Sequence, residues 1–134
     1  MTLPKFGPVG SPPALPNGGV APLSPAFAAD DLLFLSGQLP FQPDGTLDTG
    51  SIESQTQQCL NNINAILTSN GLSRTDIVKA TVWLTDVSDF AGFNSVYAAF
   101  FGDNFPARST VRSDLMLPGA RVEIEVVVSK RNIA

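Results

Sequence analysis

The sequence predicts a single α+β domain in which two helices cover one face of a mixed sheet. Its 134 residues fit one domain rather than two. Two segments repeat apolar residues at steps of three and four, as amphipathic helices do, and several others alternate or run apolar over the length of a strand. Hydrophobic residues make up 43% of the chain and charged residues 15%, which indicates a packed core rather than disorder.

The beginning of the chain differs from the rest in its proline content. Seven of the 11 prolines fall within the first 25 residues, with four glycines among them. Proline removes a backbone donor and fixes φ, so no helix is expected there. We expect residues 1–19 to form an extended arm, either a disordered tail or a strap on a neighbouring chain. Residues 20–134 are expected to form the folded domain.

Two strands are expected to open the domain. The first closes at about residues 26–27, and a turn follows at 29–31. The second, over residues 32–39, is apolar on both faces at its start, which is typical of a strand covered on both sides. Pro40 is expected to end it.

Two helices follow from the spacing of apolar residues. The first spans 51–70, with Ser51 as N-cap and Gly71 just past its C-terminus. Its apolar stripe consists of Ile52, Thr56, Cys59, Leu60, Ile63, Ile66 and Leu67. The second spans 89–101, is capped by Ser88, and has an aromatic face made of Phe90, Phe93, Tyr97, Phe100 and Phe101.

Three further strands are expected at residues 77–84, 107–112 and 122–129. In the first of these, the apolar face is expected to comprise Val78, Ala80, Val82 and Leu84. Two helices can cover only one face of such a sheet, and its other face still carries apolar residues. Self-association into a closed ring is the simplest way to cover that face.

The composition excludes several kinds of chemistry. The chain has no histidine and one cysteine, so His/Cys zinc sites and Ser-His-Asp or Cys-His catalysis are ruled out. It has no intrachain disulfide, no signal peptide and no apolar run of about 20 residues, so we expect a cytoplasmic protein without a membrane partner. The net charge of −4 argues against a nucleic-acid partner.

Charged residues in two strands are the first candidates for chemistry. Arg108 follows Pro106 at the start of a strand, where its guanidinium could grip a carboxylate with two hydrogen bonds. Glu123 and Glu125 share one face of the last strand, and a carboxylate beside an arginine could position a water for attack. The alternative interpretation is that all three are simply solvated at strand edges.

Small and aromatic residues supply weaker candidates. Ser36 and Gly37 interrupt an apolar strand, where glycine marks either close approach of a ligand or a bulge. Asn94 and Tyr97 lie three residues apart on the second helix, although Tyr97 is expected mainly in the core. Cys59 lies on the buried stripe of the first helix and is interpreted as a packing residue.

Five segments together resemble the Rid (YjgF) family. They are residues 35–40, 77–86, 93–101, 105–110 and 117–125, and the resemblance runs from about Val20 to Lys130. The Pro-Ala-Arg-Ser and Val-Glu-Ile-Glu pieces, in this order and spacing, are its most specific parts.

The resemblance implies a chorismate-mutase-like fold and a homotrimer, with the open sheet faces forming a central barrel and the sites lying in clefts between subunits. It also implies hydrolysis of 2-aminoacrylate, or its imine tautomer 2-iminopropionate, to a 2-keto acid and ammonia, without metal or organic cofactor. By resemblance, Arg108 binds the substrate carboxylate and Glu123 holds the attacking water. Residues matching the family's site lining are Ser36, Gly37, Asn94 and Thr110.

Two positions depart from the family pattern. Where relatives often have Ile-Gly-Pro-Tyr, this chain has Val-Ala-Pro-Leu at residues 20–23, so Leu23 replaces a tyrosine at the expected site. Thr110 replaces a frequent cysteine. The more apolar pocket leaves open a pathway-specific deaminase of an aminomuconate-like intermediate, and a non-catalytic trimer that binds a small acid. Ribonuclease activity is disfavoured by the acidic charge and the missing histidine.

Overall fold

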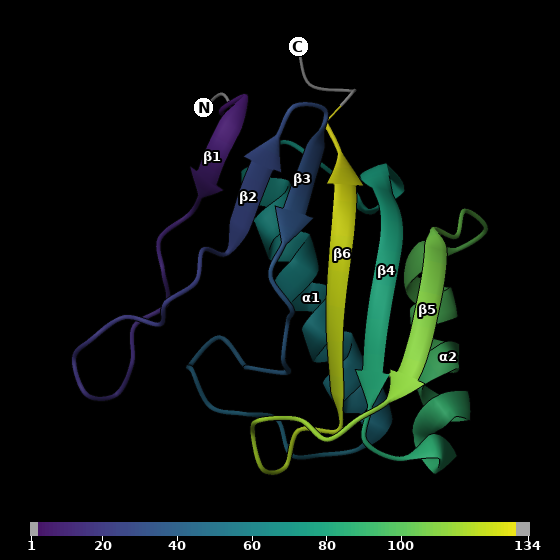
Figure 1. Cartoon of the computed structure of the whole chain (residues 1–134). Coiled ribbons are helices and arrows are strands. Elements are labelled where there is room, and N and C mark those ends of the chain that lie inside the picture. Colours follow the sequence, from purple (N-terminus) through teal and green to yellow (C-terminus); the bar gives the residue numbers. More distant parts are fainter. Residues whose placement is uncertain (1–2, 131–134) are drawn as a thin grey trace.

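The computed structural model describes residues 3–130 (Figure 1). The ends of the predicted arm and domain, residues 1–2 and 131–134, lie outside this range. The elements in chain order are β1 Phe6–Val9, β2 Ala26–Ala29, β3 Leu32–Leu35, α1 Ile52–Ser69, η1 Arg74–Asp76, β4 Ile77–Leu84, η2 Val87–Asp89, α2 Phe90–Phe101, β5 Ala107–Arg112 and β6 Val122–Ser129.

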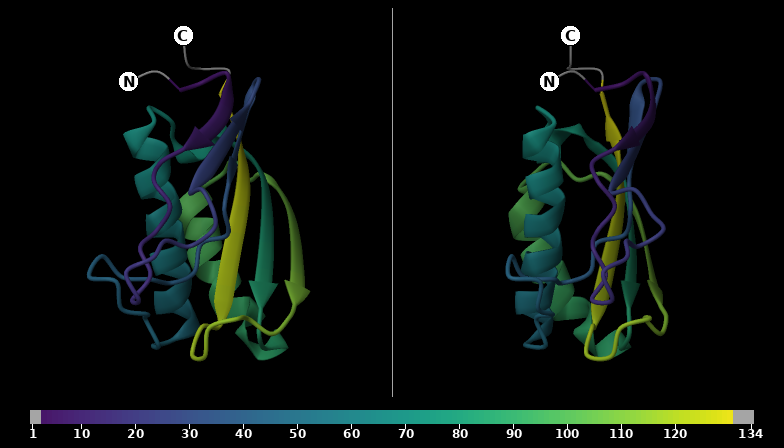
Figure 2. Two further views of the ribbon diagram at one scale, coloured as in Figure 1. Left: turned by 60° about the vertical axis from the view of Figure 1, so that its left-hand side comes forward. Right: turned by 90° about the vertical axis from the view of Figure 1, so that its left-hand side faces the viewer.

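The strands form one six-stranded sheet in the order β1-β2-β3-β6-β4-β5. Neighbouring strands are antiparallel except for β4 and β5, which run parallel and are connected through α2. The views in Figure 2 show both helices on the same side of the sheet. The predicted α+β architecture with a mixed sheet and two helices on one face is confirmed.

The beginning of the sheet differs from the prediction in three respects. Residues 6–9 of the arm form β1, which pairs with β2 along its whole length, so part of the arm belongs to the sheet. The strand expected to close at residue 27 continues to Ala29. The strand expected over 32–39 stops at Leu35, and pairing with β6 resumes at Gln38, which exchanges backbone hydrogen bonds with Ile124 one residue out of the register of β3.

The helices begin where local hydrogen bonds place them. Ser51 caps α1 as predicted, and its Oγ accepts a hydrogen bond from the Ser54 N–H at 3.1 Å. Ser88 does not cap α2: it lies within η2, where its own N–H donates to Asp86 Oδ1 at 2.8 Å. The predicted cap is therefore wrong, because the carboxylate two residues earlier takes the capping role for a short 3₁₀ turn.

A β-bulge in β4 changes which residues face the core. Ile77 pairs with Val128 of β6 and Lys79 pairs with the adjacent Val127, so Val78 has no partner of its own. Val78 is consequently 44% exposed, whereas Ile77 is buried. The prediction that Val78 belongs to the buried face is wrong, because an inserted residue reverses the alternation of a strand.

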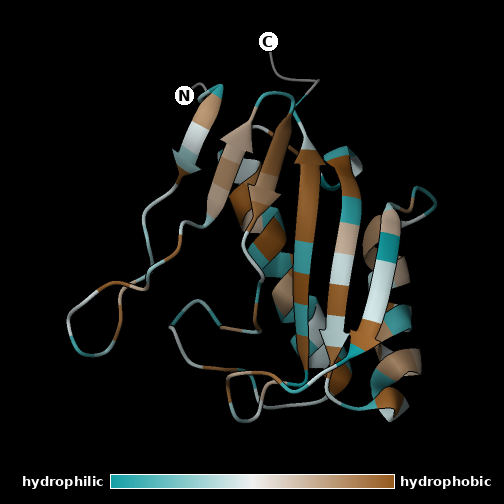
Figure 3. Cartoon of the chain, in the orientation of Figure 1, coloured by the Kyte–Doolittle hydropathy of each residue, from teal (hydrophilic) through white to brown (hydrophobic). Residues whose placement is uncertain are grey.

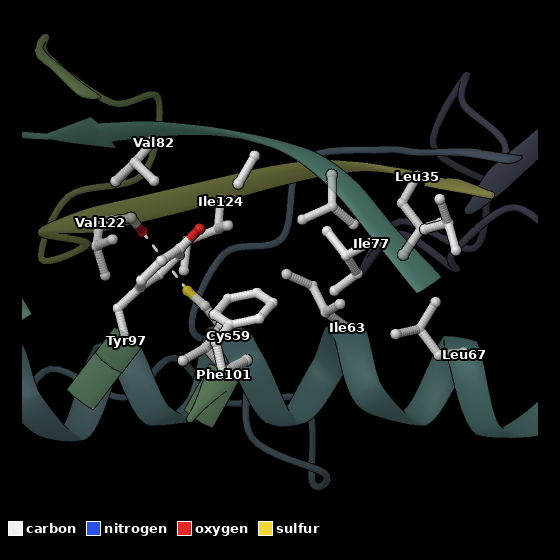
Figure 4. Close-up of a cluster of buried hydrophobic side chains, with 14 of the residues drawn as sticks. Leu35, Cys59, Ile63, Leu67, Ile77, Val82, Tyr97, Phe101, Val122 and Ile124 are labelled. Carbon is white, nitrogen blue, oxygen red and sulfur yellow. Dashed lines mark hydrogen bonds between the residues drawn. The ribbon is translucent and has the colours of Figure 1, made fainter. Parts of the chain in front are cut away.

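The core lies between the sheet and the two helices. Figure 4 shows Cys59, Ile63 and Leu67 of α1 facing the sheet, with Tyr97 from α2 beside Val122. Cys59 is fully buried and its sulfur lies 3.8 Å from the Val122 carbonyl oxygen. Its predicted packing role is confirmed, and burial raises the pKa of its thiol far above the ordinary value.

The face of the sheet opposite the helices is uncovered and partly apolar. Its large apolar residues, each more than a third exposed, are Phe27, Leu32, Phe34, Val78 and Val111. In Figure 3, β3 and the upper part of β6 are brown, which marks hydrophobic residues. Brown and teal residues alternate toward the lower end of β6. Self-association through this face stays a prediction. Neither described helix has the length and apolar character needed to cross a bilayer.

Candidate functional site

Glu123 lies on the open face of the sheet, directly beside Gly37. It pairs in register with Trp83 of β4, between the buried residues Val122 and Ile124 of its own strand. A Cβ atom added to Gly37 would overlap the carboxylate oxygen Oε2 of Glu123 and lie 3.0 Å from its Cδ. Glycine at this position therefore lets the backbone approach the carboxylate of Glu123, while close approach of a ligand at Gly37 stays a prediction.

The surroundings of Glu123 favour its protonated form. Partial burial raises the pKa of its carboxyl, and the negative charge of Glu125 raises it further. A carboxylate with a raised pKa is a better proton acceptor at neutral pH than an ordinary one. Glu123 therefore has the properties of a group that accepts a proton from water.

Two more predicted residues lie on the segment next to Gly37. The Ser36 hydroxyl donates to the Ser24 carbonyl at 2.6 Å, and the Ser36 N–H donates to the Pro25 carbonyl. These bonds fix the strand end against the loop that carries Leu23, which is 44% exposed. We refer to Leu23, Ser36, Gly37 and Glu123 as the carboxylate cluster.

Arg108 lies on β5 and packs over aromatic rings of α2. Its guanidinium carbon is 4.8 Å from the ring centre of Tyr97, 5.3 Å from that of Phe93 and 5.8 Å from that of Phe90. Cation–π contacts at these distances hold the guanidinium in place without neutralising it. Within residues 3–130 it forms no ion pair, so its charge is available to an anion.

A cavity of about 280 Å³ adjoins this arginine. It is lined by Asn94, Tyr97, Ala98, Phe105, Pro106 and Arg108. Tyr97 is almost fully buried, and its hydroxyl has no hydrogen-bond partner among the described residues. Burial raises the pKa of Tyr97, while the positive charge of Arg108 acts in the opposite direction.

Thr110 lies two residues along β5, at a second and smaller cavity. This cavity has a volume of about 160 Å³ and is lined by Leu84, Val87, Phe90, Thr110, Val111 and Arg112. The Thr110 hydroxyl oxygen is buried and has no partner among residues 3–130. We refer to Asn94, Tyr97, Arg108 and Thr110 as the arginine cluster.

β5 is the last strand of the sheet and has one unpaired edge. Alternate residues of a parallel strand bond to the neighbouring strand, and those between them face away. The Ser113 N–H donates to the Leu84 carbonyl at 2.9 Å. By this alternation the backbone groups of Arg108, Thr110 and Arg112 are expected at the free edge, where they can bind a ligand.

The two clusters lie on opposite faces of the sheet within one chain. Arg108 pairs with Ala80, which is buried beneath the helices, so its side chain is on the helix side. Glu123 pairs with Trp83 on the open side. The structure thus brings Ser36, Gly37 and Glu123 together, and Asn94, Tyr97 and Arg108 together, but it does not unite the two groups.

Three residues near the clusters were missed in the sequence. Lys79 is half-buried on the open face, and its Nζ donates to Ser109 Oγ at 3.1 Å. Phe90 was predicted only as part of the aromatic face of the second helix; it is 43% exposed and borders both Arg108 and the smaller cavity. Phe105 lines the larger cavity. Its position three residues before Arg108 is the sequence feature that could have identified it as a site residue.

An ion pair anchors the loop that leads to Glu123. Arg121 donates from Nε to Asp89 Oδ2 at 3.1 Å and from Nη2 to Asp89 Oδ1 at 2.6 Å. The buried Gln55 side chain accepts from the Arg121 N–H at 2.7 Å and donates to the Gly119 carbonyl at 2.9 Å. These bonds tie the start of β6 to both helices and so fix the backbone that carries Glu123.

The described residues contain no group of three or more acidic or cysteine side chains that could hold a metal ion. The arrangement instead offers a cation for an anionic substrate group and a carboxylate for proton transfer. In one chain these two groups lie on opposite faces of the sheet, so they can act on one substrate only where separate copies bring them together.

A family model described as endoribonuclease L-PSP matches residues 16–130. Among similar sequences, the RutC family protein y4sK of Sinorhizobium fredii is 44% identical over 84% of this chain and 90% of its own length. A human protein named 2-iminobutanoate/2-iminopropanoate deaminase is 37% identical over 82% of this chain and 81% of its own.

Solved structures show the same fold. The crystal structure of the YjgF gene product from E. coli has a TM-score of 0.80 and 32% identity, and the match covers 92% of this chain and 98% of that one. The crystal structure of yeast Mmf1 has a TM-score of 0.82 and 36% identity, covering 94% and 99% of the two chains. The sequence and structural matches agree on one family.

Proposed function

The chain belongs to the Rid (YjgF) family, and from that premise we propose that it hydrolyses enamine or imine acids to 2-keto acids and ammonia. The relatives named 2-iminobutanoate/2-iminopropanoate deaminase support this choice of reaction. The observation that carries it is Arg108, an arginine without an ion pair within residues 3–130 that is held on aromatic rings at the mouth of a cavity.

In the proposed reaction Arg108 binds the substrate carboxylate through two parallel hydrogen bonds. The backbone N–H of Thr110, at the free edge of β5, can donate to the same group. Tyr97 and Asn94 border the cavity that receives the rest of the substrate. These contacts hold the C=N carbon in a fixed place, which raises the effective concentration of the attacking water.

Glu123 accepts a proton from the water as its oxygen bonds to the imine carbon. The resulting carbinolamine then loses ammonia as the C–N bond breaks and the carbonyl forms, so the net reaction consumes one water. Glu123 passes its first proton to the imine nitrogen to give the neutral carbinolamine, and then transfers the carbinolamine hydroxyl proton to the same nitrogen as it leaves. Ser36 and Gly37 position this carboxylate, and no metal or organic cofactor takes part in the scheme.

Arg108 and Glu123 meet, in this proposal, between copies of the chain. They face opposite sides of the sheet in one copy, and β5 has a free edge that another copy can approach. A cyclic trimer, with the open faces forming a central barrel, would bring the arginine cluster of one subunit to the carboxylate cluster of the next.

The test is ammonia release from imines that an amino-acid oxidase generates in situ. We expect Arg108→Met and Glu123→Gln each to abolish the acceleration, whereas Arg74→Met, on the exposed η1 turn, leaves it unchanged. Unaltered rates in both site variants would refute the proposal. Binding of a 2-keto acid at Arg108 without any turnover would instead support the non-catalytic alternative.

Mixing the two inactive variants tests the composite site. If each site takes its arginine and its carboxylate from different subunits, co-refolded mixtures regain roughly a quarter of the wild-type activity, because some neighbouring pairs are then intact. If both residues come from one chain, the mixture stays inactive.

A further inference from the structure

The chain has one tryptophan, and the sheet places it directly beside Glu123. Trp83 of β4 pairs in register with Glu123 of β6. The residues on either side of it, Val82 and Leu84, are buried beneath the helices. Because side chains alternate along a strand, the indole of Trp83 lies on the open face, as the Glu123 carboxylate does. The Cβ atoms of such a cross-strand pair are about 4.5–5.5 Å apart, which puts the indole within reach of the carboxylate.

The carboxylate of Glu123 lies in a slot between Trp83 and Gly37. On the side toward β3, a Cβ atom added to Gly37 would lie 3.0 Å from the Glu123 Cδ. On the side toward β4, Trp83 is half-buried and has Val111 of β5 as its other partner (Figure 1). The slot is therefore bounded by backbone on one side and by an aromatic ring on the other.

No cation is paired with Glu123 in the part of the chain that the structure describes. The Lys79 Nζ on β4 donates to Ser109 Oγ at 3.1 Å, and Ser109 lies on β5, on the far side of β4 from β6. Arg121 precedes Glu123 by two residues but is held by both oxygens of Asp89. The charge of an ionised Glu123 is therefore not offset by a neighbouring basic side chain.

The other polar groups beside Glu123 also leave its negative charge without support. The Ser36 hydroxyl donates to the Ser24 carbonyl, and the Gln38 amide donates to the Ser36 carbonyl. Burial is the main cause that raises the pKa of Glu123, and the negative charge of Glu125 is the second. An aromatic ring on one side of a carboxyl contributes to such burial because it excludes water.

We propose that Trp83 is a positioning residue for Glu123: its indole keeps water away from one side of the carboxylate and so holds Glu123 ready to accept a proton at neutral pH. This inference rests on the proposed function for the use that the reaction makes of Glu123. The indole acts as an apolar wall, so a phenyl ring can replace it and a small polar side chain cannot. Arg108 lies on the other face of the sheet, so the effect should fall on the pH dependence and not on KM.

The glutamate carboxyls can be titrated one by one by NMR. The chain has three glutamates, Glu53, Glu123 and Glu125, so isotope-labelled glutamate gives three carboxyl signals, which single glutamine variants assign. We expect Trp83→Thr, which suits a strand, to increase the acid dissociation constant of Glu123 at least roughly threefold. Trp83→Phe should leave it within about twofold of the wild type. Phe27→Thr is the matched control: it removes an aromatic ring from the same face of β2, which β3 separates from β6, and should not move the titration.

The fluorescence of Trp83 provides a second measurement that needs no change at this position. Protonation of a carboxyl beside an indole alters its emission, and no other tryptophan contributes to the signal. The emission of the wild type should follow the same midpoint as the Glu123 carboxyl signal. Glu123→Gln should abolish this transition, whereas Glu53→Gln should retain it. An emission that does not follow the Glu123 titration would overturn the inference.

Turnover separates this inference from the proposed function. In imine hydrolysis, Trp83→Thr should move the acidic limb of the kcat/KM profile to lower pH with KM unchanged at neutral pH, and Trp83→Phe should match the wild type. An unmoved Glu123 titration in Trp83→Thr, or an equal move in Trp83→Phe, would overturn the inference while imine hydrolysis stands. A Glu123 titration that moves as expected, in a protein whose Glu123→Gln variant keeps full activity, would support the inference and refute the proposed role of Glu123.

Discussion

Replacing Gly37 by alanine tests whether the position of Glu123 controls the reaction. The new Cβ would overlap Glu123 Oε2 and lie 3.0 Å from its Cδ and 3.3 Å from its Cγ. The carboxylate must therefore rotate away by a distance on the order of 1 Å, which can lower a rate about 100-fold. We expect kcat to fall by this factor with KM almost unchanged, because Arg108 still anchors the substrate.

The stability of Gly37→Ala should stay close to that of the wild type. Gly37 is not among the residues with positive φ, so alanine fits its backbone. Alanine reduces the entropy of the unfolded chain, which stabilises by about 0.4–1 kcal/mol. A displaced rotamer of Glu123 costs about 0.5–1.5 kcal/mol. The two effects nearly cancel, so a large loss of activity is expected without a large change in the free energy of unfolding.

Steady-state imine hydrolysis and urea unfolding measure both quantities. Gly19→Ala is a matched control, since its Cβ would meet the Asn17 side chain, at 3.2 Å, far from Gly37 in the sequence. In a Glu123→Gln background, Gly37→Ala should add little further loss. A wild-type kcat in Gly37→Ala would show that the position of Glu123 does not control the rate. A further 100-fold loss when Gly37→Ala is added to Glu123→Gln would show that Gly37 acts on something other than Glu123.

Four further predictions concern single side chains. Burial and Glu125 raise the pKa of Glu123, so Glu125→Gln should move the acidic limb of the kcat/KM profile to lower pH. Because the pKa of Glu123 is higher in the folded chain than in the unfolded chain, the free energy of unfolding falls as pH rises through the interval between these two pKa values. At pH above that interval, Glu123→Gln should have a higher Tm than the wild type. Asp89→Asn removes the charge that holds Arg121 and should cost about 1–3 kcal/mol in urea unfolding. Thr56→Val removes a buried hydroxyl without a partner within residues 3–130 and should stabilise by about 1 kcal/mol.

Each of these predictions has an outcome that contradicts it. A Tm of Glu123→Gln at or below that of the wild type at neutral pH would show that the ionised Glu123 does not destabilise the fold. An unmoved pH profile in Glu125→Gln would show that Glu125 does not act on Glu123. Asp103→Asn is exposed and should be neutral, so equal losses in it and in Asp89→Asn would remove the ion-pair explanation. A loss of stability in Thr56→Val would mean that the hydroxyl has a partner in solution.

The spacing of apolar residues predicted most of the helices and strands, because burial of one face of each element dictates that spacing. The apolar stripe of α1 and the strands at residues 77–84 and 122–129 were located from spacing, the strand at 107–112 from the preceding Pro106, and the strand bounds agree with the structure. The errors fall where a local hydrogen bond or an insertion competes with burial. Ser88 lost the capping role to Asp86, and the bulge turned Val78 outward.

The candidate site was predictable in its charges but not in its geometry. Glu123 stood out because charges are unusual in an apolar strand, and Arg108 because it follows a proline at the start of a strand. The family resemblance then selected both residues, and the structure gives each a distinctive setting. The faces on which they lie depend on pairing between strands distant in sequence. Lys79 was missed for the same reason, since only the bulge and the parallel pairing with β5 show where it lies.

The parallel pairing of β5 accounts for the separation of the two clusters. Crossing through α2 returns the chain to the sheet beside β4, with Arg108 beneath the helices and one edge unpaired. Glu123, on an inner strand, faces the open side, which is also the side with exposed apolar residues. If assembly covers that open face in the way we propose, it also completes the proposed site, and the binding energy between copies would then position Arg108 against Glu123. Dilution that separates the subunits should then remove activity while each chain stays folded.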